Sequence, residues 1–114
     1  MMTTYLISFP SSAMDVSAEE LPAVSDAAHA VIREAKDAGV FVFAGGLQES
    51  VAPVLVAGYG TVTEGAYPET ARLSGGFAVL ELPSREDAVE WAAKIATACR
   101  CPQEVREFMY DPLV

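Results

Sequence analysis

Two stretches of the chain carry apolar residues at helical spacing, and strand-like runs precede and follow each of them. In residues 23–38 the apolar positions recur every three or four residues, and Gly39 follows as a stop signal. The second stripe begins after Ser84, which stands three residues before Asp87 in the manner of a helix N-cap. Two helices that are each enclosed between strands predict an α+β domain.

The strand-like runs occur in an order that selects one fold. They are short, rich in β-branched and aromatic residues, and bounded by Gly or Pro: residues 3–9, 40–47, 52–65, 76–83 and 103–110. Residues 52–65 break at the glycines 58 and 60 and return as a small extra hairpin strand. The order predicts a ferredoxin-like βαββαβ sandwich with both helices on one face of an antiparallel sheet. The length of 114 residues predicts a single domain, 1–114.

The sheet face that the helices do not cover is also predicted to be apolar. Two runs alternate apolar residues on both sides: Phe41 and Phe43 against Val40 and Val42, and Phe77 and Val79 against Ala78, Leu80 and Leu82. A face in contact with water would carry polar side chains instead. We expect a second copy of the chain to cover this face, so that a homodimer forms with a cavity between the sheets. The alternative is that a different protein docks there.

Charge and hydropathy exclude several classes of partner. The formal net charge is −9, with only seven Lys and Arg residues, so we expect neither nucleic acid nor an anionic membrane surface as a partner. No apolar run approaches the roughly 20 residues that cross a bilayer. The first ten residues lack the basic and apolar segments of a signal peptide. These features predict a cytoplasmic protein.

The sequence predicts no metal and no cofactor. Cys99 and Cys101 are the two cysteines, His29 is the single histidine, and no further ligands stand at metal-binding spacing. A disulfide across one intervening residue would be strained. No phosphate-binding loop, dinucleotide fingerprint or Gly-x-Ser-x-Gly motif is present.

The segment TEGAYPETARLSGGF, residues 63–77, resembles the signature segment of the YCII-related family, in the subgroup named for an Asp-Gly-Pro-Phe run. Residues 44–48 and 86–95 resemble other family segments. The matching positions of the signature are Thr63, Gly65, Glu69, Thr70, Gly75, Gly76 and Phe77. The resemblance implies a dimeric α/β-barrel arrangement with a cleft beside the sheet, and in some members a His-Asp acid–base pair. Most members have no assigned activity.

The chain departs from the subgroup pattern at several positions. Glu64 stands in place of the aspartate, Ala66 in place of the proline and Tyr67 in place of the phenylalanine, while Ala71 and Arg72 replace a Lys-Glu pair. The carboxylate and the aromatic ring are thus retained. Glutamate is one methylene longer than aspartate, however, and proton transfer requires hydrogen-bond distance.

His29 falls near the position where one branch of the family carries its histidine on the first helix. A histidine is the natural proton shuttle near neutral pH, and a carboxylate can orient its ring. On a helical wheel, His29 projects about 140° from the side predicted to be buried, which is typical of a solvated residue. Two interpretations follow: a solvated helix residue, or a catalytic residue acting with Glu64.

Residues 64–72 supply the other candidates. We expect Glu64 and Tyr67 at the mouth of a pocket between or beside the sheets, because loops that leave strand ends collect binding groups. Glu69 and Arg72 are further candidates for ligand binding. Alternatively, Tyr67 fills the edge of the core, and Glu64 pairs with Arg72 on the surface. Three glycines are predicted to be structural, through positive φ or close backbone approach: Gly65, Gly75 and Gly76.

Two hypotheses for the function come from different classes. The first is a homodimer that binds a small organic ligand in a cleft beside the sheet. The alternative is a small metal-free acid–base enzyme, of lyase, isomerase or hydrolase type, in which His29 and Glu64 move protons on a carbonyl compound such as a lactone.

Overall fold

The computed structural model describes residues 2–114. Its strands and α-helices, in chain order, are β1 (Thr3–Phe9), α1 (Leu21–Asp37), β2 (Phe41–Gly46), β3 (Val54–Val56), β4 (Val62–Glu64), β5 (Gly76–Leu82), α2 (Arg85–Cys99) and β6 (Glu104–Glu107). Two 3₁₀ turns, η1 (Ser11–Ala13) and η2 (Pro68–Thr70), lie in the connections. Within these residues, no helix combines the length and the apolar character that a membrane span requires.

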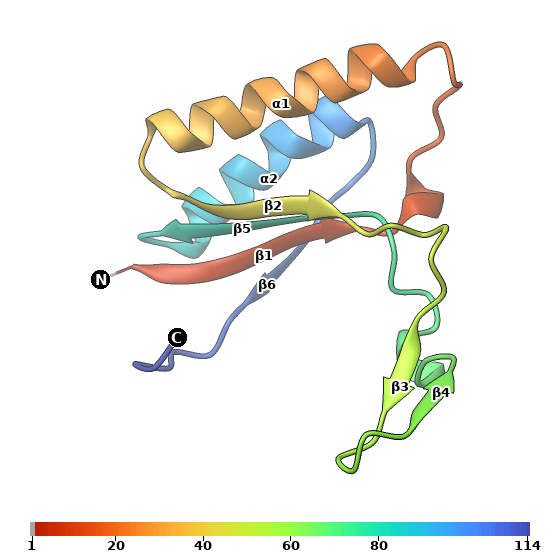
Figure 1. Ribbon diagram of the computed structural model, residues 1–114. Helices are drawn as coiled ribbons and strands as arrows, with labels where there is room; N and C mark the ends of the chain where they lie inside the picture. Colours follow the sequence, from red (N-terminus) through yellow and green to blue (C-terminus); the bar gives the residue numbers. More distant parts are fainter. Residues whose placement is uncertain (1) are drawn as a thin grey trace.

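The main sheet has four antiparallel strands in the order β2-β5-β1-β6, and both helices cover one of its faces (Figure 1). In the long central pairing of β1 with β5, Thr3 lies opposite Leu82 and Phe9 opposite Gly76. Strands β3 and β4 form a separate two-stranded hairpin that projects away from the sheet and the helices (Figure 1). The ferredoxin-like α+β prediction and the extra hairpin are confirmed.

The hydrophobic core lies between the sheet and the two helices. Its largest fully buried side chains are Ile7 of β1 and Leu80 and Leu82 of β5. The helices contribute small residues to this cluster, since the buried helical members are Ala35, Ala88 and Ala92. Small side chains let each helix lie close to the sheet, which leaves the large β-branched and leucine side chains of the strands to fill the layer.

One strand departs from the alternation that the sequence suggests. The pairing of β2 with β5 shifts register between Phe41 and Phe43, so that Phe41 lies opposite Leu80 and Phe43 opposite Val79. Phe41 consequently packs against the core, whereas Phe43 lies on the face away from the helices and is 61% exposed. The prediction that both phenylalanines share one face is therefore wrong, because the extra residue of a β-bulge reverses the side-chain direction.

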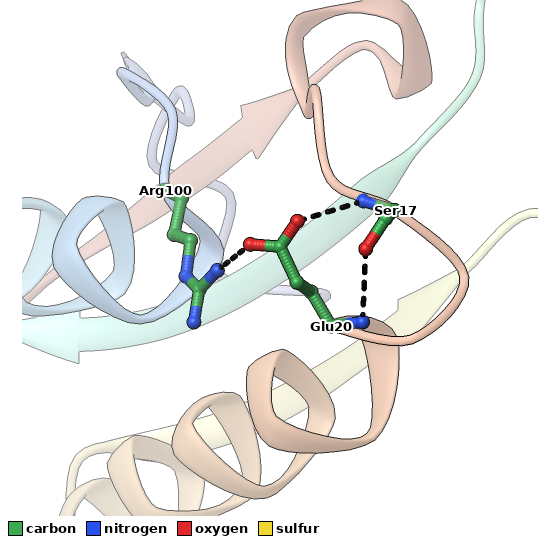
Figure 2. Close-up of polar contacts among 3 residues, drawn as sticks. All are labelled: Ser17, Glu20 and Arg100. Atoms are coloured by element: carbon green, nitrogen blue, oxygen red, sulfur yellow. Dashed lines mark hydrogen bonds and ion pairs between the residues drawn. The ribbon is translucent and has the colours of Figure 1, made fainter.

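A reciprocal capping box precedes α1. The hydroxyl of Ser17 accepts a hydrogen bond from the backbone N–H of Glu20 at 3.2 Å, and the carboxylate of Glu20 accepts one from the Ser17 N–H at 3.1 Å (Figure 2). Arg100, which adopts a left-handed conformation after α2, donates to the same carboxylate. One glutamate thus connects the beginning of α1 with the end of α2, and these bonds, foremost that from the Ser17 N–H, lower its pKa.

Candidate ligand pockets

The first pocket lies between the two helices and the end of the sheet where β1 and β2 finish and β5 begins. Its volume is about 330 Å³. Helix α1 contributes Ala28 and Ile32, helix α2 contributes Ile95, and the strands contribute mainly small or apolar residues. We call it the helix pocket. The concentration of Ala and Gly at this end of the sheet leaves room that larger side chains would fill.

Two polar side chains reach the wall of the helix pocket. One is His29 of α1, which is exposed on the helix surface and borders the pocket beside Ala28. The other is Gln103, whose amide donates to the carbonyl oxygen of Cys101 at 3.2 Å. The carboxamide oxygen of Gln103 is buried and accepts no hydrogen bond from the described residues. His29 is therefore exposed, as the helical wheel indicated, and lies beside a pocket; its catalytic role with Glu64 stays a prediction.

Cys99 is the last residue of α2, and Cys101 follows two positions later. Both thiols are buried and free, and Cys99 borders the helix pocket. Burial raises the pKa of Cys99, the neighbouring Cys101 raises it further, and burial likewise raises the pKa of Cys101. Both groups are therefore protonated near neutral pH, where a nucleophile or metal ligand needs a thiolate. In residues 2–114, no three His, Cys, Asp or Glu side chains are grouped as metal ligands would be.

The second pocket opens on the sheet face away from the helices, and we call it the sheet pocket. It has a volume of about 250 Å³ and lies between the end of β1, strand β6 and the residues that precede β5. Leu6, Leu73 and Phe77 give it apolar walls, and Arg72 and Arg106 border it with positive charge. Of the candidate ligand-binding residues in the signature segment, Arg72 thus lies at a pocket.

The other candidates of the signature segment lie elsewhere in the single chain. Glu64 ends β4 opposite Val54, on the projecting hairpin. Glu69 belongs to the exposed turn η2, and Tyr67 immediately precedes this turn. The Thr70 N–H donates to the carbonyl oxygen of Tyr67 at 3.0 Å. Tyr67 is 66% exposed and so does not fill the core edge. These three residues line neither pocket, and Glu64 forms no ion pair with Arg72 among the described residues. Their roles stay predictions.

The glycine pair fixes this segment to the end of β1. Gly75 has φ = +82°, and a Cβ atom there would lie 2.0 Å from the carbonyl oxygen of Phe9. A Cβ on Gly76 would come within 2.8 Å of the Phe9 ring. Glu49 supports the same contact, because its carboxylate accepts hydrogen bonds from the Ser11 hydroxyl at 2.9 Å and from the Gly75 N–H at 3.4 Å. The prediction of a structural role is confirmed here, and Gly65 has φ = +117°.

Comparison with known proteins identifies the family. The family model described as the YCII-related domain matches residues 3–108, which include every strand and helix of the fold. The chain belongs to the YCII-related family. No curated protein matches it. The assignment to the Asp-Gly-Pro-Phe subgroup rests on the residues of the signature segment and stays a prediction.

In this YCII-related domain, sequence reasoning missed several residues at the pockets. Ser8 and Arg106 line the sheet pocket, and Gln103 lines the helix pocket. Alternation along residues 3–9 was a usable signal for Ser8, because it places this serine on the same face as Leu6. Arg106 carries no such signal, since its proximity to Arg72 depends on how β6 pairs with β1.

Proposed function

We propose that this YCII-related protein is a homodimer that binds a small, largely apolar organic ligand in the helix pocket. The observation that carries the ligand-binding proposal is the composition of that pocket. Its walls are mostly apolar, and His29 and Gln103 supply a small number of polar groups. Small-molecule sites combine an apolar lining with a few polar groups that orient the ligand.

The dimer is supported by the amount of surface that the single chain exposes. Its accessible area is 8075 Å², whereas a folded monomer of 12.1 kDa exposes about 6,000 Å². The excess of about 2,000 Å² lies in the range that one partner of a permanent dimer buries. The radius of gyration is 15.9 Å, compared with about 13 Å for a compact chain of this length. A second copy packed on the open sheet face and the projecting hairpins accounts for both values.

A titration with indole, a neutral apolar probe, tests the ligand site. We expect backbone amide signals of Ala28, Ile32 and Ile95 to shift in a ¹H–¹⁵N correlation spectrum as indole is added. Ala28→Leu should fill the pocket and weaken binding at least tenfold. Ala27→Leu is the matched control, because Ala27 is exposed on the same helix and does not line the pocket. Equal binding by the two variants would contradict the proposal.

The enzyme hypothesis keeps one supporting observation, the position of His29 at the helix pocket. Glu64 of the same chain lies on the projecting hairpin, so an acid–base pair would require Glu64 of a second copy to approach the pocket. Hydrolysis of γ-butyrolactone, followed by pH-stat, tests this hypothesis. It predicts turnover that His29→Gln and Glu64→Gln each abolish, and an absence of turnover by the wild type would count against it.

A further inference from the structure

We propose that the sheet pocket is a separate binding site for a small monocarboxylate with an apolar body, in which Arg72 and Arg106 hold the carboxylate. The site goes beyond the proposed function, because it takes a different class of ligand and lies on the other face of the sheet from the helix pocket. In the proposed homodimer the second copy covers this face, so the ligand would be held between the two copies. The argument rests on the two arginines, on a serine hydroxyl that lines the same pocket, and on the apolar walls.

The two arginines give this pocket a net positive charge, whereas the molecule as a whole is negatively charged. The whole chain carries −9, yet the charged side chains that border the pocket are Arg72, Arg106 and Glu104, with a net charge of +1. Glu104 accepts from Arg106 at 3.1 Å in an exposed ion pair, which uses part of one guanidinium. The three ion pairs of the described residues involve Lys94, Arg100 and Arg106. Arg72 therefore retains its donors for a ligand.

The second observation is the hydroxyl of Ser8. Ser8 is 6% exposed, the single buried polar residue of the described core, and it lines the sheet pocket. In the sheet it lies opposite Phe77 on β5 and opposite Glu104 on β6. Among residues 2–114, the one fully buried side-chain oxygen without a partner belongs to Gln103, so the Ser8 hydroxyl is accessible from the pocket that it lines. A hydroxyl that faces a pocket can donate a hydrogen bond to a ligand oxygen there.

The shape and chemistry of the pocket favour a carboxylate on an apolar body. A planar guanidinium donates two parallel hydrogen bonds to a carboxylate, and these charge-assisted bonds are stronger than neutral ones. Leu6, Leu73 and Phe77 provide the surface against which an aliphatic or aromatic body packs. A net charge of +1 matches one carboxylate rather than a doubly charged phosphate. The volume of about 250 Å³ limits the ligand to a small molecule.

Titration with phenylacetate, and with 2-phenylethanol as its uncharged counterpart, tests the site. We expect phenylacetate to bind at least tenfold more tightly than 2-phenylethanol and to shift the amide signals of Leu6, Ser8 and Arg106, which line the sheet pocket and not the helix pocket. Arg72→Gln should weaken phenylacetate binding at least tenfold and leave 2-phenylethanol binding unchanged. Arg33→Gln is the matched control: it removes the same charge from an exposed arginine of α1 outside both pockets, and we expect less than a twofold effect.

Two further measurements make the outcome unambiguous. Ser8→Ala should weaken phenylacetate severalfold, and raised salt should weaken it in the wild type, because exposed charges are screened. Equal affinities for phenylacetate and 2-phenylethanol, or equal effects of Arg72→Gln and Arg33→Gln, would overturn the proposal. Shifts confined to residues of the helix pocket would also overturn it. Indole binding at the helix pocket is expected to be unaffected by Arg72→Gln, so the failure of either site is distinguished from failure of the other.

Discussion

Replacement of Gly75 by alanine is expected to destabilise the protein more than the same replacement at Gly39 or Gly58. The residue has φ = +82°, a conformation that costs an alanine about 1–2 kcal/mol. The new Cβ would also lie 2.0 Å from the Phe9 carbonyl oxygen and 2.8 Å from the Ser11 nitrogen. Since both atoms belong to the backbone, the segment must move away. It then loses its hydrogen bonds to Glu49 and Ser11, which contribute about 1 kcal/mol each.

These contributions sum to about 3–4 kcal/mol, or a fall in Tm of about 12–16 °C at roughly 4 °C per kcal/mol. Thermal unfolding monitored by circular dichroism measures the change. Gly39→Ala isolates the conformational cost, because Gly39 has φ = +74° and open space around its Cβ position. Gly58→Ala should be nearly neutral, since Gly58 has neither a positive φ nor a neighbour within 4 Å. If Gly75→Ala melts no earlier than Gly39→Ala, the close-approach argument is refuted.

Three further predictions concern side chains. Hydrogen bonds lower the pKa of Glu20 in the folded protein. The ionised carboxylate therefore contributes to stability above the ordinary pKa of glutamate, and this contribution is lost as the pH falls through the folded-state pKa. Glu20→Gln should lower Tm at pH 7 but not in acid, which calorimetry at both pH values measures. Cys99 and Cys101 should react with iodoacetamide at pH 7 far more slowly in the native than in the urea-unfolded protein, and equal rates measured by mass spectrometry would contradict their burial and raised pKa. Glu64→Gln and Tyr67→Ala should each leave Tm within a few degrees of the wild-type value, because substitutions of exposed residues usually cost under about 0.5 kcal/mol. A much lower Tm for either variant would show that the signature segment stabilises the fold.

Local patterns predicted the elements of this fold well. Helical spacing located both helices, Gly39 marked the end of α1, and the hydroxyl of Ser84 accepts from the Asp87 N–H at 3.2 Å as the N-cap pattern indicated. Simple alternation failed at Val42, because a β-bulge depends on how β2 pairs with β5 rather than on the composition of β2 alone.

Pocket residues were harder to predict than secondary structure. His29 is exposed, as the helical wheel indicated, and borders one pocket, while Arg72 borders another. The sequence did not predict the roles of Arg106 at the sheet pocket or of Glu49 beside Gly75, because both depend on contacts between segments far apart in the chain. The bond between Arg100 and Glu20 joins residues 80 positions apart and was invisible for the same reason.

The molar mass in solution tests the proposed covering of the open sheet face most directly. Light scattering at micromolar concentration should give about twice the chain mass of 12.1 kDa. Phe43 is 61% exposed on that face, and Val89 is 51% exposed on α2, on the helix side. We expect Phe43→Glu to give a folded protein with the mass of a single chain, whereas Val89→Glu, the matched control, retains the dimer mass. A wild-type mass of 12.1 kDa, or a dimer that Phe43→Glu leaves intact, would contradict a dimer built on this face.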